Sequence, residues 1–439
     1  MRGLPRGWEW TRFEEVATVE SNLVDPAEYP NAPHIAPNHI ERRTGRLLPY
    51  TTVRGDAVTS SKHRFFPGQI LYSKIRPYLA KAVRVEFSGL CSADMYPIST
   101  HLDTRFFHYW LLSSEFTAFA ASQQGRSVLP KINREALAKL PVPVAPSGEQ
   151  ERIVDAIEEH VSRLEAAKAL LVAAEERLKV LAHASSRLLF ESRSWPWTTL
   201  GEIADVAGGV TKDSKRQADP SFVEVPYLRV ANVQRGRLDL GHVTTIRVHP
   251  DKAKALRLEP GDILLNEGGD RDKLGRGWVW EGQIDGCIHQ NHVFRARLHD
   301  DFDPYFVSTH ANSWGRAWFE RHGRQTTNLA SISLHTLKQL PVPAPPRAEQ
   351  ESVVDELRRS GDAHLRLNRS IERAREHADV LRRSILVAAF SGRLVPQASD
   401  DDPASVLLER IRAQREAAIM NRRTRVHAKP TRKGNGHDR

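Results

Sequence analysis

Residues 140–155 read LPVPVAPSGEQERIVD, and residues 340–355 read LPVPAPPRAEQESVVD. The offset of 200 residues persists without a gap through Leu181 and Leu381 to Phe190 and Phe390. The beginnings of the two halves repeat as well, because Trp8-Glu-Trp-Thr is matched by Trp195-Pro-Trp-Thr at an offset of 187 residues. The sequence between these landmarks diverges. The chain is therefore predicted to run domain, helix, second unlike domain, second helix.

The segments that follow the two Pro-Val-Pro motifs predict long helices. Ser147 is a candidate N-cap, and Glu149 and Glu151 suit the positive end of a helix. Spacing of three and four residues then predicts a coiled-coil seam in both segments. A complete domain lies between the helices, so they can run antiparallel as a rod on the order of 60 Å. The seam residues are Ile157, His160, Leu164, Ala167, Leu171, Ala174, Leu178, Leu181, Ser185 and Leu188, then Leu357, Ser360, His364, Leu367, Ile371, Ala374, Ala378, Leu381, Ile385 and Ala388.

The two domains have the composition of β-rich structure. Short apolar or aromatic runs are broken by Pro, Gly, Asp and Asn, with one helical stretch around 106–122 and another around 305–322. The predicted fold class is α/β: two β-rich domains separated by a pair of long antiparallel coiled-coil helices, related by a pseudo-twofold repeat. The predicted boundaries are 1–146 for the first domain, 147–194 for its helix, 195–345 for the second domain, 346–395 for its helix, and 396–439 for a short helix and a basic tail that is disordered from about Asn421.

Composition narrows the function classes. The chain has 439 residues, no apolar run long enough to span a membrane and no signal-peptide pattern, so we expect a cytoplasmic protein. The net charge is +10, but residues 410–439 alone carry 10 basic and 2 acidic residues. The domains are only mildly basic, so DNA binding requires charge arranged on one face. Cys91 and Cys287 are interpreted as buried, unpaired thiols.

Candidate DNA-contacting residues follow from their chemistry: Lys and Arg suit phosphates and guanine, while Asn and Gln suit adenine. Solvated surface loops are the alternative explanation for each of them. The tryptophans of the two Trp-x-Trp pairs are interpreted as core rather than as base-stacking platforms. His160 and His364 are interpreted as seam residues rather than metal ligands. The candidates are Lys74, Arg76, Lys81, Arg126, Lys131 and Arg134 in the first domain, and Arg271, Lys273, Arg276, Gln325, Thr326, Thr327 and Asn328 in the second.

Catalytic motifs are missing from the sequence. It has neither a Gly-x-x-x-x-Gly-Lys-Ser/Thr loop nor an Asn-Pro-Pro-Tyr methylation motif. The segment from Asp303 to Phe306 is a superficial match that opens a helix, and the carboxylates between Asp262 and Asp272 are interpreted as loop-stabilising. We therefore expect a non-catalytic chain that binds no cofactor of its own and no metal.

The sequence resembles the specificity subunits of type I restriction-modification systems (HsdS). The motifs that carry the resemblance are the two Pro-Val-Pro/Glu-Gln-Glu segments, the Trp-x-Trp-Thr openings, SKIRPYL at 73–79, GGDRDKLGR at 268–276 and AAFSGRL at 388–394. It implies two target recognition domains that each read one half of a split, asymmetric site in double-stranded DNA. It also implies helices that dock methyltransferase subunits (HsdM, two copies), to which a restriction subunit (HsdR) is added. S-adenosylmethionine would then belong to the methyltransferase, and ATP and Mg to the restriction subunit.

The architecture independently favours DNA, because two unlike domains at a fixed separation suit a ligand that repeats every 3.4 Å or so. Two other classes of protein stay open. A free-standing nuclease or methyltransferase would bind a metal or methyl donor by itself. A coiled-coil scaffold would join proteins without sequence-specific DNA binding.

Overall fold

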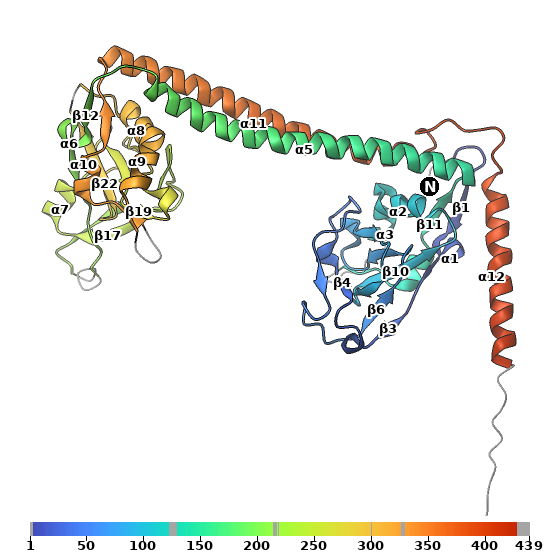
Figure 1. Cartoon of the computed structure of the whole chain (residues 1–439). Coiled ribbons are helices and arrows are strands. Elements are labelled where there is room, and N and C mark those ends of the chain that lie inside the picture. The colour runs from blue at the N-terminus through green and yellow to red at the C-terminus, as the bar shows by residue number, and fades with distance from the viewer. Residues whose placement is uncertain are drawn as a thin grey trace, which may run out of the picture. The chain divides into compact units, whose positions relative to one another are not determined.

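The computed structural model describes residues 3–122, 130–213, 217, 219–299, 301–325 and 330–427, apart from the side chains of His183, Gln325, Ile419 and residues 421–427. The chain divides into two compact units. Unit 1 comprises residues 1–170 and 373–439, and unit 2 comprises residues 171–372. Each of the two long helices, α5 (Ser147–Glu191) and α11 (Arg347–Ala389), therefore contributes one part to each unit (Figure 1).

Unit 1 is built on three sheets of strand order β1-β11, β2-β10-β7-β8 and β3-β6-β9-β4-β5. The second is antiparallel throughout, and the third contains one parallel pair, β4 with β9. Short helices connect the sheets. The elements are β1 (Glu9–Arg12), α1 (Phe13–Val16), β2 (Ala17–Val19), β3 (Leu23–Val24), β4 (Pro33–Ile35), β5 (Thr51–Thr52), β6 (Lys62–Phe65), β7 (Ile70–Ser73), β8 (Ala82–Arg84), β9 (Gly89–Cys91), β10 (Met95–Thr100), α2 (Thr104–Leu112), α3 (Ser114–Ser122), α4 (Arg134–Ala138) and β11 (Pro141–Val144), with 3₁₀ turns η1 (Pro26–Glu28), η2 (Pro37–His39) and η3 (Pro77–Leu79).

Unit 2 repeats this frame. The pair β12-β25 matches β1-β11, and the sheet β13-β22-β18-β20 matches β2-β10-β7-β8 strand for strand. The remaining sheets are β17-β14-β21, β15-β16 and β19-β24-β23. The elements are β12 (Trp197–Thr199), α6 (Leu200–Ile203), β13 (Ala204–Ala207), β14 (Val223–Leu228), β15 (Val233–Gln234), β16 (Arg237–Leu238), β17 (Thr244–Val248), α7 (Pro250–Ala255), β18 (Ile263–Asn266), β19 (Gly268–Gly269), η5 (Arg271–Lys273), β20 (Gly277–Val279), β21 (Ile288–His289), β22 (Val293–Leu298), α8 (Pro304–Asn312), α9 (Trp314–His322), β23 (Arg324–Gln325), β24 (Ala330–Ser331), α10 (Leu334–Lys338) and β25 (Pro341–Pro343).

Both predicted helical stretches are pairs of helices. The stretch around 106–122 forms α2 and α3, which meet at Ser113, and the stretch around 305–322 forms α8 and α9, which meet at Ser313. Asp103 and Asp303 cap α2 and α8, because each carboxylate accepts two backbone N–H groups of the first turn. Each unit then buries its own apolar core on these helices, around Phe106 and Trp110 in unit 1 and around Phe306 and Phe319 in unit 2. Cys91 and Cys287 are buried, free thiols, as predicted.

Within each unit, α5 and α11 run antiparallel. In unit 1, Lys168 pairs with Asp379 (2.6 Å) and Glu165 with Arg382 (3.0 Å), so residue numbers rise along one helix as they fall along the other. In unit 2, Leu357 of α11 joins the core that contains Phe190 of α5. The antiparallel arrangement of the fold-class prediction is therefore confirmed inside each unit.

The predicted seam is wrong at several positions: Ala167, Ser360 and Leu367 are exposed, and so are Leu181 and Leu381. Leu181 and Leu381 are 62% and 52% exposed, whereas the next residue in α11, Arg382, is only 8% exposed. A straight helix has 3.6 residues per turn, so a strict seven-residue pattern drifts by about 20° per heptad. The contacting face consequently moves by one residue, to Ala182 and Arg382.

The C-terminal helix α12 (Ala404–His427) belongs to unit 1. Ala404, Leu408 and Ile411 are buried in the same core as Phe106, and Arg412 pairs with Glu15 of α1 (3.1 Å). The prediction that residues from Asn421 are disordered is wrong for 421–427, which continue the helix, while 428–439 lie outside the described residues. Among the described residues, no helix has the length and apolar character to cross a membrane.

Candidate nucleic-acid interface

The ends of β7 and β18 occupy equivalent places in the two units. The N–H of Lys74 donates to Asp94 O and the carbonyl of Lys74 accepts from Ile132 N (3.0 and 2.9 Å). In unit 2, the N–H of Glu267 donates to His292 O and its carbonyl accepts from Ile332 N (3.0 and 2.9 Å). The same backbone bonds therefore bring the segment after the central strand against the segment around 131 in unit 1 and around 331 in unit 2.

In unit 1 this place gathers positive charge around one aromatic ring. The Lys74 ammonium and the Arg134 guanidinium lie 5.8 and 5.6 Å from the centre of the Tyr96 ring, a cation–π arrangement. The Tyr96 hydroxyl is held by donation to Ile132 O (3.2 Å). Burial, followed by the nearby charges of Arg134 and Lys74, lowers the pKa of His63, whose buried Nδ1 has no hydrogen-bond partner among the described residues. The cluster is therefore electropositive and contains an unused polar atom.

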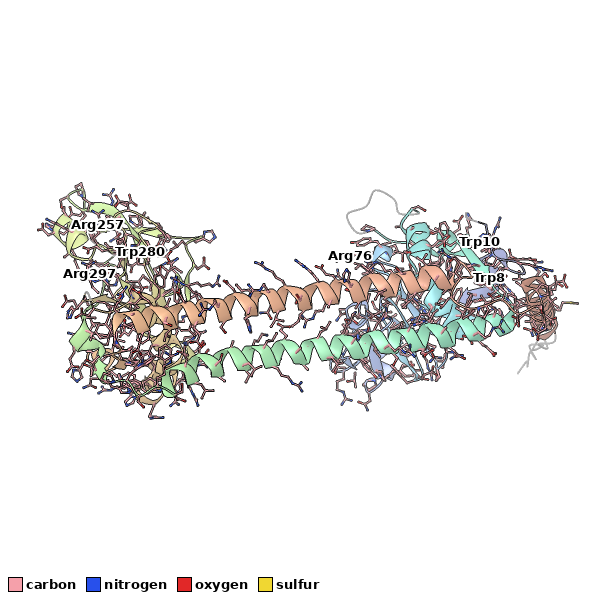
Figure 2. The ribbon with its side chains drawn as sticks, turned by 90° about the horizontal axis from the view of Figure 1, so that it is seen from above. Trp8, Trp10, Arg76, Arg257, Trp280 and Arg297 are labelled. Carbon is pink, nitrogen blue, oxygen red and sulfur yellow. The ribbon has the colours of Figure 1, made fainter. Side chains whose placement is uncertain are left out.

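Of the other predicted residues of unit 1, Arg76 and Lys131 lie beside this cluster, whereas Lys81 makes a structural contact. Ile75 forms a bridge with Lys131, and the N–H of Arg76 donates to Pro130 O (2.8 Å). Both cationic side chains are exposed, and Arg76, labelled in Figure 2, adopts a left-handed backbone conformation (φ 48°), which is uncommon away from glycine. Lys81 instead donates to Pro37 O (2.6 Å), and burial together with Arg76 lowers its pKa. Lys81 therefore has a structural contact, while Arg126 lies outside the described residues.

In unit 2 the predicted residues meet at the small sheet β19-β24-β23. Gly268 and Gly269 pair with Ser331 and Ala330, and Gln325 pairs with Ala330. The glycine-rich loop and the strand that carries Gln325 therefore lie side by side in this sheet, whereas Thr326, Thr327 and Asn328 lie outside the described residues.

Two of the three cations of the glycine-rich loop, Arg271 and Lys273, are bonded to other residues of unit 2. Arg271 donates through Nε and Nη2 to Glu320 O (3.1 and 2.9 Å), and Lys273 pairs with Asp270. Burial lowers the pKa of Arg276, and its buried Nε has no hydrogen-bond partner among the described residues.

Steric contacts within unit 2 explain why Gly275 and Gly277 are glycines. A Cβ at Gly277 would lie 1.8 Å from Leu264 O, and one at Gly275 would overlap the ring of Phe319 at 2.1 Å. Gly275 also has a positive φ of 61°. The loop therefore needs glycine to pack against β18 and α9, whatever else it contacts.

The two equivalent places carry side chains of opposite charge. In unit 1, Lys74 forms an ion pair with Asp94 (3.7 Å), while in unit 2 Glu267 bonds to His292 Nδ1 (2.6 Å). In unit 1 the lysine precedes its carboxylate partner, whereas in unit 2 the carboxylate precedes its histidine partner. All four side chains are partly exposed, from 24% for Lys74 to 55% for His292. The common frame thus presents different hydrogen-bonding groups in the two units.

The Glu-Gln-Glu motifs have a role that sequence reasoning missed. Trp8 Nε1 donates to Glu149 (3.0 Å), and Trp195 Nε1 donates to Glu349 (2.8 Å). The predicted helix-terminus role of Glu149 therefore leaves out its main contact, at the beginning of α5 near the labelled Trp8 (Figure 2). The signal was present in the sequence as the co-repetition of both motifs.

The glutamines of the same motifs fasten each domain to its helix. Gln150 accepts from Asp103 N (3.1 Å) and donates to Ala145 O (2.8 Å). Gln350 accepts from Asp303 N (2.8 Å) and donates to Pro345 O (2.9 Å).

The tryptophan pairs divide between core and surface. Trp8 is buried in the core of unit 1, and Trp10 packs on Trp110 with ring centres 6.0 Å apart. Trp195 packs against the core of unit 2. Trp197 is 46% exposed, with its ring against Trp314 (5.1 Å).

The carboxylates singled out in the sequence have structural partners. Asp303 caps α8 and pairs with Arg347 (3.0 Å). Asp262 is 1% exposed and accepts from the Nε and Nη2 atoms of Arg297 (both 2.8 Å), a fork that crosses the sheet beside β18. These contacts agree with the loop-stabilising interpretation.

Comparisons with known proteins point to one family. Residues 5–175 match the family model described as type I restriction modification DNA specificity domain. The EcoDI specificity subunit of Escherichia coli is 50% identical over 156 residues, which cover 36% of this chain and 35% of that protein. The match thus spans about a third of that relative.

Solved structures share the fold over most of the chain. A chain from a structure described as the structural basis of complex assembly and conformational transition of the type I R-M system aligns with a TM-score of 0.66, at 19% identity, over 90% of this chain and 100% of its own. The HsdS subunit from Thermoanaerobacter tengcongensis aligns with a TM-score of 0.58, at 19% identity, over 89% and 98%. The chain is thus similar to a type I restriction modification DNA specificity domain over residues 5–175, and it shares its fold with these two solved structures.

Proposed function

We propose that this chain reads DNA sequence for a type I restriction-modification complex and has no chemistry of its own. Units 1 and 2 would each read one half of a split, asymmetric site in double-stranded DNA. The helices α5 and α11 would set the spacing and dock methyltransferase subunits (HsdM, two copies), and a restriction subunit (HsdR) would complete the nuclease. S-adenosylmethionine, ATP and Mg would be bound by those partners.

The single observation that carries this proposal is the equivalence of Lys74 and Glu267. Their identical backbone bonds, with an ion pair at Lys74 and a carboxylate–histidine hydrogen bond at Glu267, support one docking frame with two specificities. Lys and Arg donate to guanine O6 and N7, whereas Glu accepts from cytosine N4 and Gln pairs with adenine. We therefore infer that unit 1 favours guanine or phosphate at this place, and that unit 2 favours cytosine or adenine.

The spacing role is supported by the length of the helices. A helix of 45 residues such as α5 is about 68 Å long at 1.5 Å per residue, or roughly two turns of B-DNA. A scaffold that only joins proteins would not need two domains with different polar groups in the same place.

The proposal is tested by DNA binding of the assembled methyltransferase complex. Lys74→Ala and Arg134→Ala should each weaken binding to the recognised duplex, and the salt slope should fall by about one unit for each phosphate that is no longer neutralised. Lys139→Ala is the matched control. Lys139 is exposed at the end of α4, the helix that begins at Arg134, and its ion pair among the described residues is the local one with Glu135. Glu267→Gln should relax base preference in one half-site only. Equal affinity for all duplexes, unaltered by these changes, would leave the scaffold explanation standing.

A further inference from the structure

The domain of each unit is fastened to the long helices α5 and α11 at two equivalent places. The first is the glutamine fastening described above. At the second, Arg105 forms an ion pair with Glu158 of α5 (3.4 Å). Two hundred residues later the corresponding pair is Tyr305 and Arg358, and the Arg358 guanidinium lies 5.1 Å from the centre of the Tyr305 ring. Both domains are thus held near the beginning of a long helix.

Unit 1 has a third fastening, further along the helices. Arg382 of α11, which is 8% exposed, donates to Thr44 O (2.6 Å) and pairs with Glu165 of α5 (3.0 Å). Thr44 lies in the loop 41–46 of the domain, and Glu165 follows Gln150 by 15 residues. At 1.5 Å per residue, the third fastening is about 22 Å along α5 from the first. A bond at this distance opposes tilting of the domain on the helices.

The loop that carries Thr44 is braced within its own domain. Glu41 accepts from the Nε and Nη2 atoms of Arg46 (2.9 and 3.0 Å) and from the Thr44 hydroxyl (2.8 Å). Gly45 lies so close to α2 that a Cβ would be 2.6 Å from the His108 ring. The loop therefore moves together with its domain, and the domain can tilt away from the helices only if the arginine bond breaks.

The side chains that make the third fastening are replaced in unit 2. At the repeat offset of 200 residues, Arg382 corresponds to Ala182. Glu165 corresponds to Leu365, which is 56% exposed. Neither alanine nor leucine has a side-chain group that forms hydrogen bonds. These two positions of unit 2 therefore cannot reproduce the arginine bond.

The domain of unit 2 has the same turn as the loop 41–46, shortened by two residues. In unit 1, Arg43 N donates to Ala80 O (3.1 Å). In unit 2, Gly236 N donates to Gly277 O (3.1 Å). Arg43 and Gly236 also share a left-handed φ of 62° and 71°. The two turns are therefore equivalent, and the one in unit 2 has less reach.

The shorter turn bonds to its own domain and leaves an opening beside the helices. Arg235 of this turn donates to Asn312 O (2.9 Å) and Asp272 O (2.8 Å). Arg235 and Asn312 line a cavity of about 1160 Å³ together with Ala182 of α5 and Leu357 of α11. Where unit 1 has the arginine bond, unit 2 therefore has open space, into which its domain can tilt.

We propose that Arg382 is a positioning residue, which fixes the angle of the first domain on the helices, while the second domain adjusts its angle when DNA binds. Of the three fastenings of unit 1, unit 2 shares the two that lie near the beginning of a helix. The inference rests on the proposed function, because the angle of each domain contributes to the distance between the two half-sites. Arg382 then determines, together with the length of the helices, which spacer between the half-sites is accepted.

The test measures methylation against spacer length. The full-length chain is assembled with the methyltransferase subunit of its own system, and duplexes carry the recognised motif with its natural spacer or with one base pair more or fewer. Arg382→Ala removes the bond to Thr44 O, and Arg382→Lys keeps one donor for it. The control is Arg383→Ala, the same substitution at the exposed neighbouring position of α11. Hydrogen exchange of residues 41–46 in the same complexes reports whether the loop is released.

Arg382→Ala should raise methylation of the two altered spacers by about tenfold relative to the natural one, because the loss of one hydrogen bond from a charged group changes an equilibrium constant by about this factor. Exchange of residues 41–46 should become faster by a similar factor. Arg383→Ala should keep the wild-type ratio, and Arg382→Lys should restore most of it.

Two results would overturn the proposal. One is an unchanged spacer ratio in Arg382→Ala although exchange of the loop is faster. The other is an equal loss of methylation at all three spacers, which is the result of general destabilisation rather than of a changed angle. A wild-type complex that methylates no split motif would refute the proposed function itself, whereas a split motif with an unchanged ratio refutes the role of Arg382 alone.

Discussion

Replacing Gln350 by Met should selectively destabilise unit 2. Gln350 is 1% exposed, accepts from Asp303 N (2.8 Å), and donates to Pro345 O (2.9 Å) and Asp301 O (3.2 Å). Methionine keeps the length of the side chain but makes none of these bonds. A net hydrogen bond contributes about 0.5–1.5 kcal/mol and an orphaned buried donor costs about 1–3 kcal/mol, so the loss should be about 3–4 kcal/mol. At roughly 2–4 °C per kcal/mol for a unit of this size, its Tm should fall by about 10 °C.

Differential scanning calorimetry of the full chain, with hydrogen exchange to assign each transition, measures this effect. Gln150→Met should produce the matching loss in unit 1, because Gln150 makes two of the equivalent bonds. Gln283→Met, at an exposed loop position of unit 2, should leave both transitions in place. A fall of less than about 1 kcal/mol for Gln350→Met would show that the domain is not fastened to its helix through this side chain.

Two further predictions concern the stability of unit 2 at low pH and the effect of adding a side chain at Gly277. Burial lowers the pKa of His289 and His310 to about 4, from an ordinary 6.5. As pH falls, the unfolded chain therefore binds protons at these histidines before the folded chain does. The free energy of unfolding of unit 2 should fall between about pH 6.5 and pH 4, by about 2 kcal/mol per histidine at pH 5. Thermal unfolding measured over a pH series tests this, and full stability of unit 2 at pH 5 would refute it. Gly277→Ala should destabilise unit 2 by about 1–3 kcal/mol or more because its Cβ would meet Leu264 O, whereas Gly208→Ala, with open space, should be nearly neutral; equal Tm shifts for the two in thermal unfolding would contradict the clash.

The order of domains and helices is predictable from the sequence because the motifs that mark it occur once in each half of the chain. The repeated Pro-Val-Pro motifs mark the β11 and β25 strands, and the segments after them form α5 and α11. The exact face of these helices is not predictable from a strict heptad, since the geometry of 3.6 residues per turn moves Leu381 to the surface and Arg382 inward. The role of Gln350 in fastening the domain to its helix depends on a hydrogen bond with Asp303 N across 47 residues, which local sequence pattern does not encode.

The candidate interface could be predicted in outline for a similar reason. The chemistry of basic and amide side chains alone predicts which residues could contact DNA. The structure brings Lys74, Arg76, Lys131 and Arg134 together because the bridge from Ile75 to Lys131 joins their segments. The residue types alone do not predict that Lys81 donates a hydrogen bond to Pro37 O or that Arg271 donates one to Glu320 O. The pairing of Glu267 with Lys74 as equivalent positions required the backbone bonds, because the two segments share no sequence at that point. Whether these residues contact DNA stays a prediction.

The central claim is that the two units read two halves of one DNA site, and adenine methylation tests it most directly. The chain is co-expressed with its methyltransferase subunit, assembly is confirmed, and modified adenines are mapped across a genome by single-molecule sequencing. Methylation confined to one split, asymmetric motif, with Glu267→Gln relaxing bases in only one half, is the predicted result. Methylation by the assembled complex that is absent, or unrelated to a split motif, would contradict the claim.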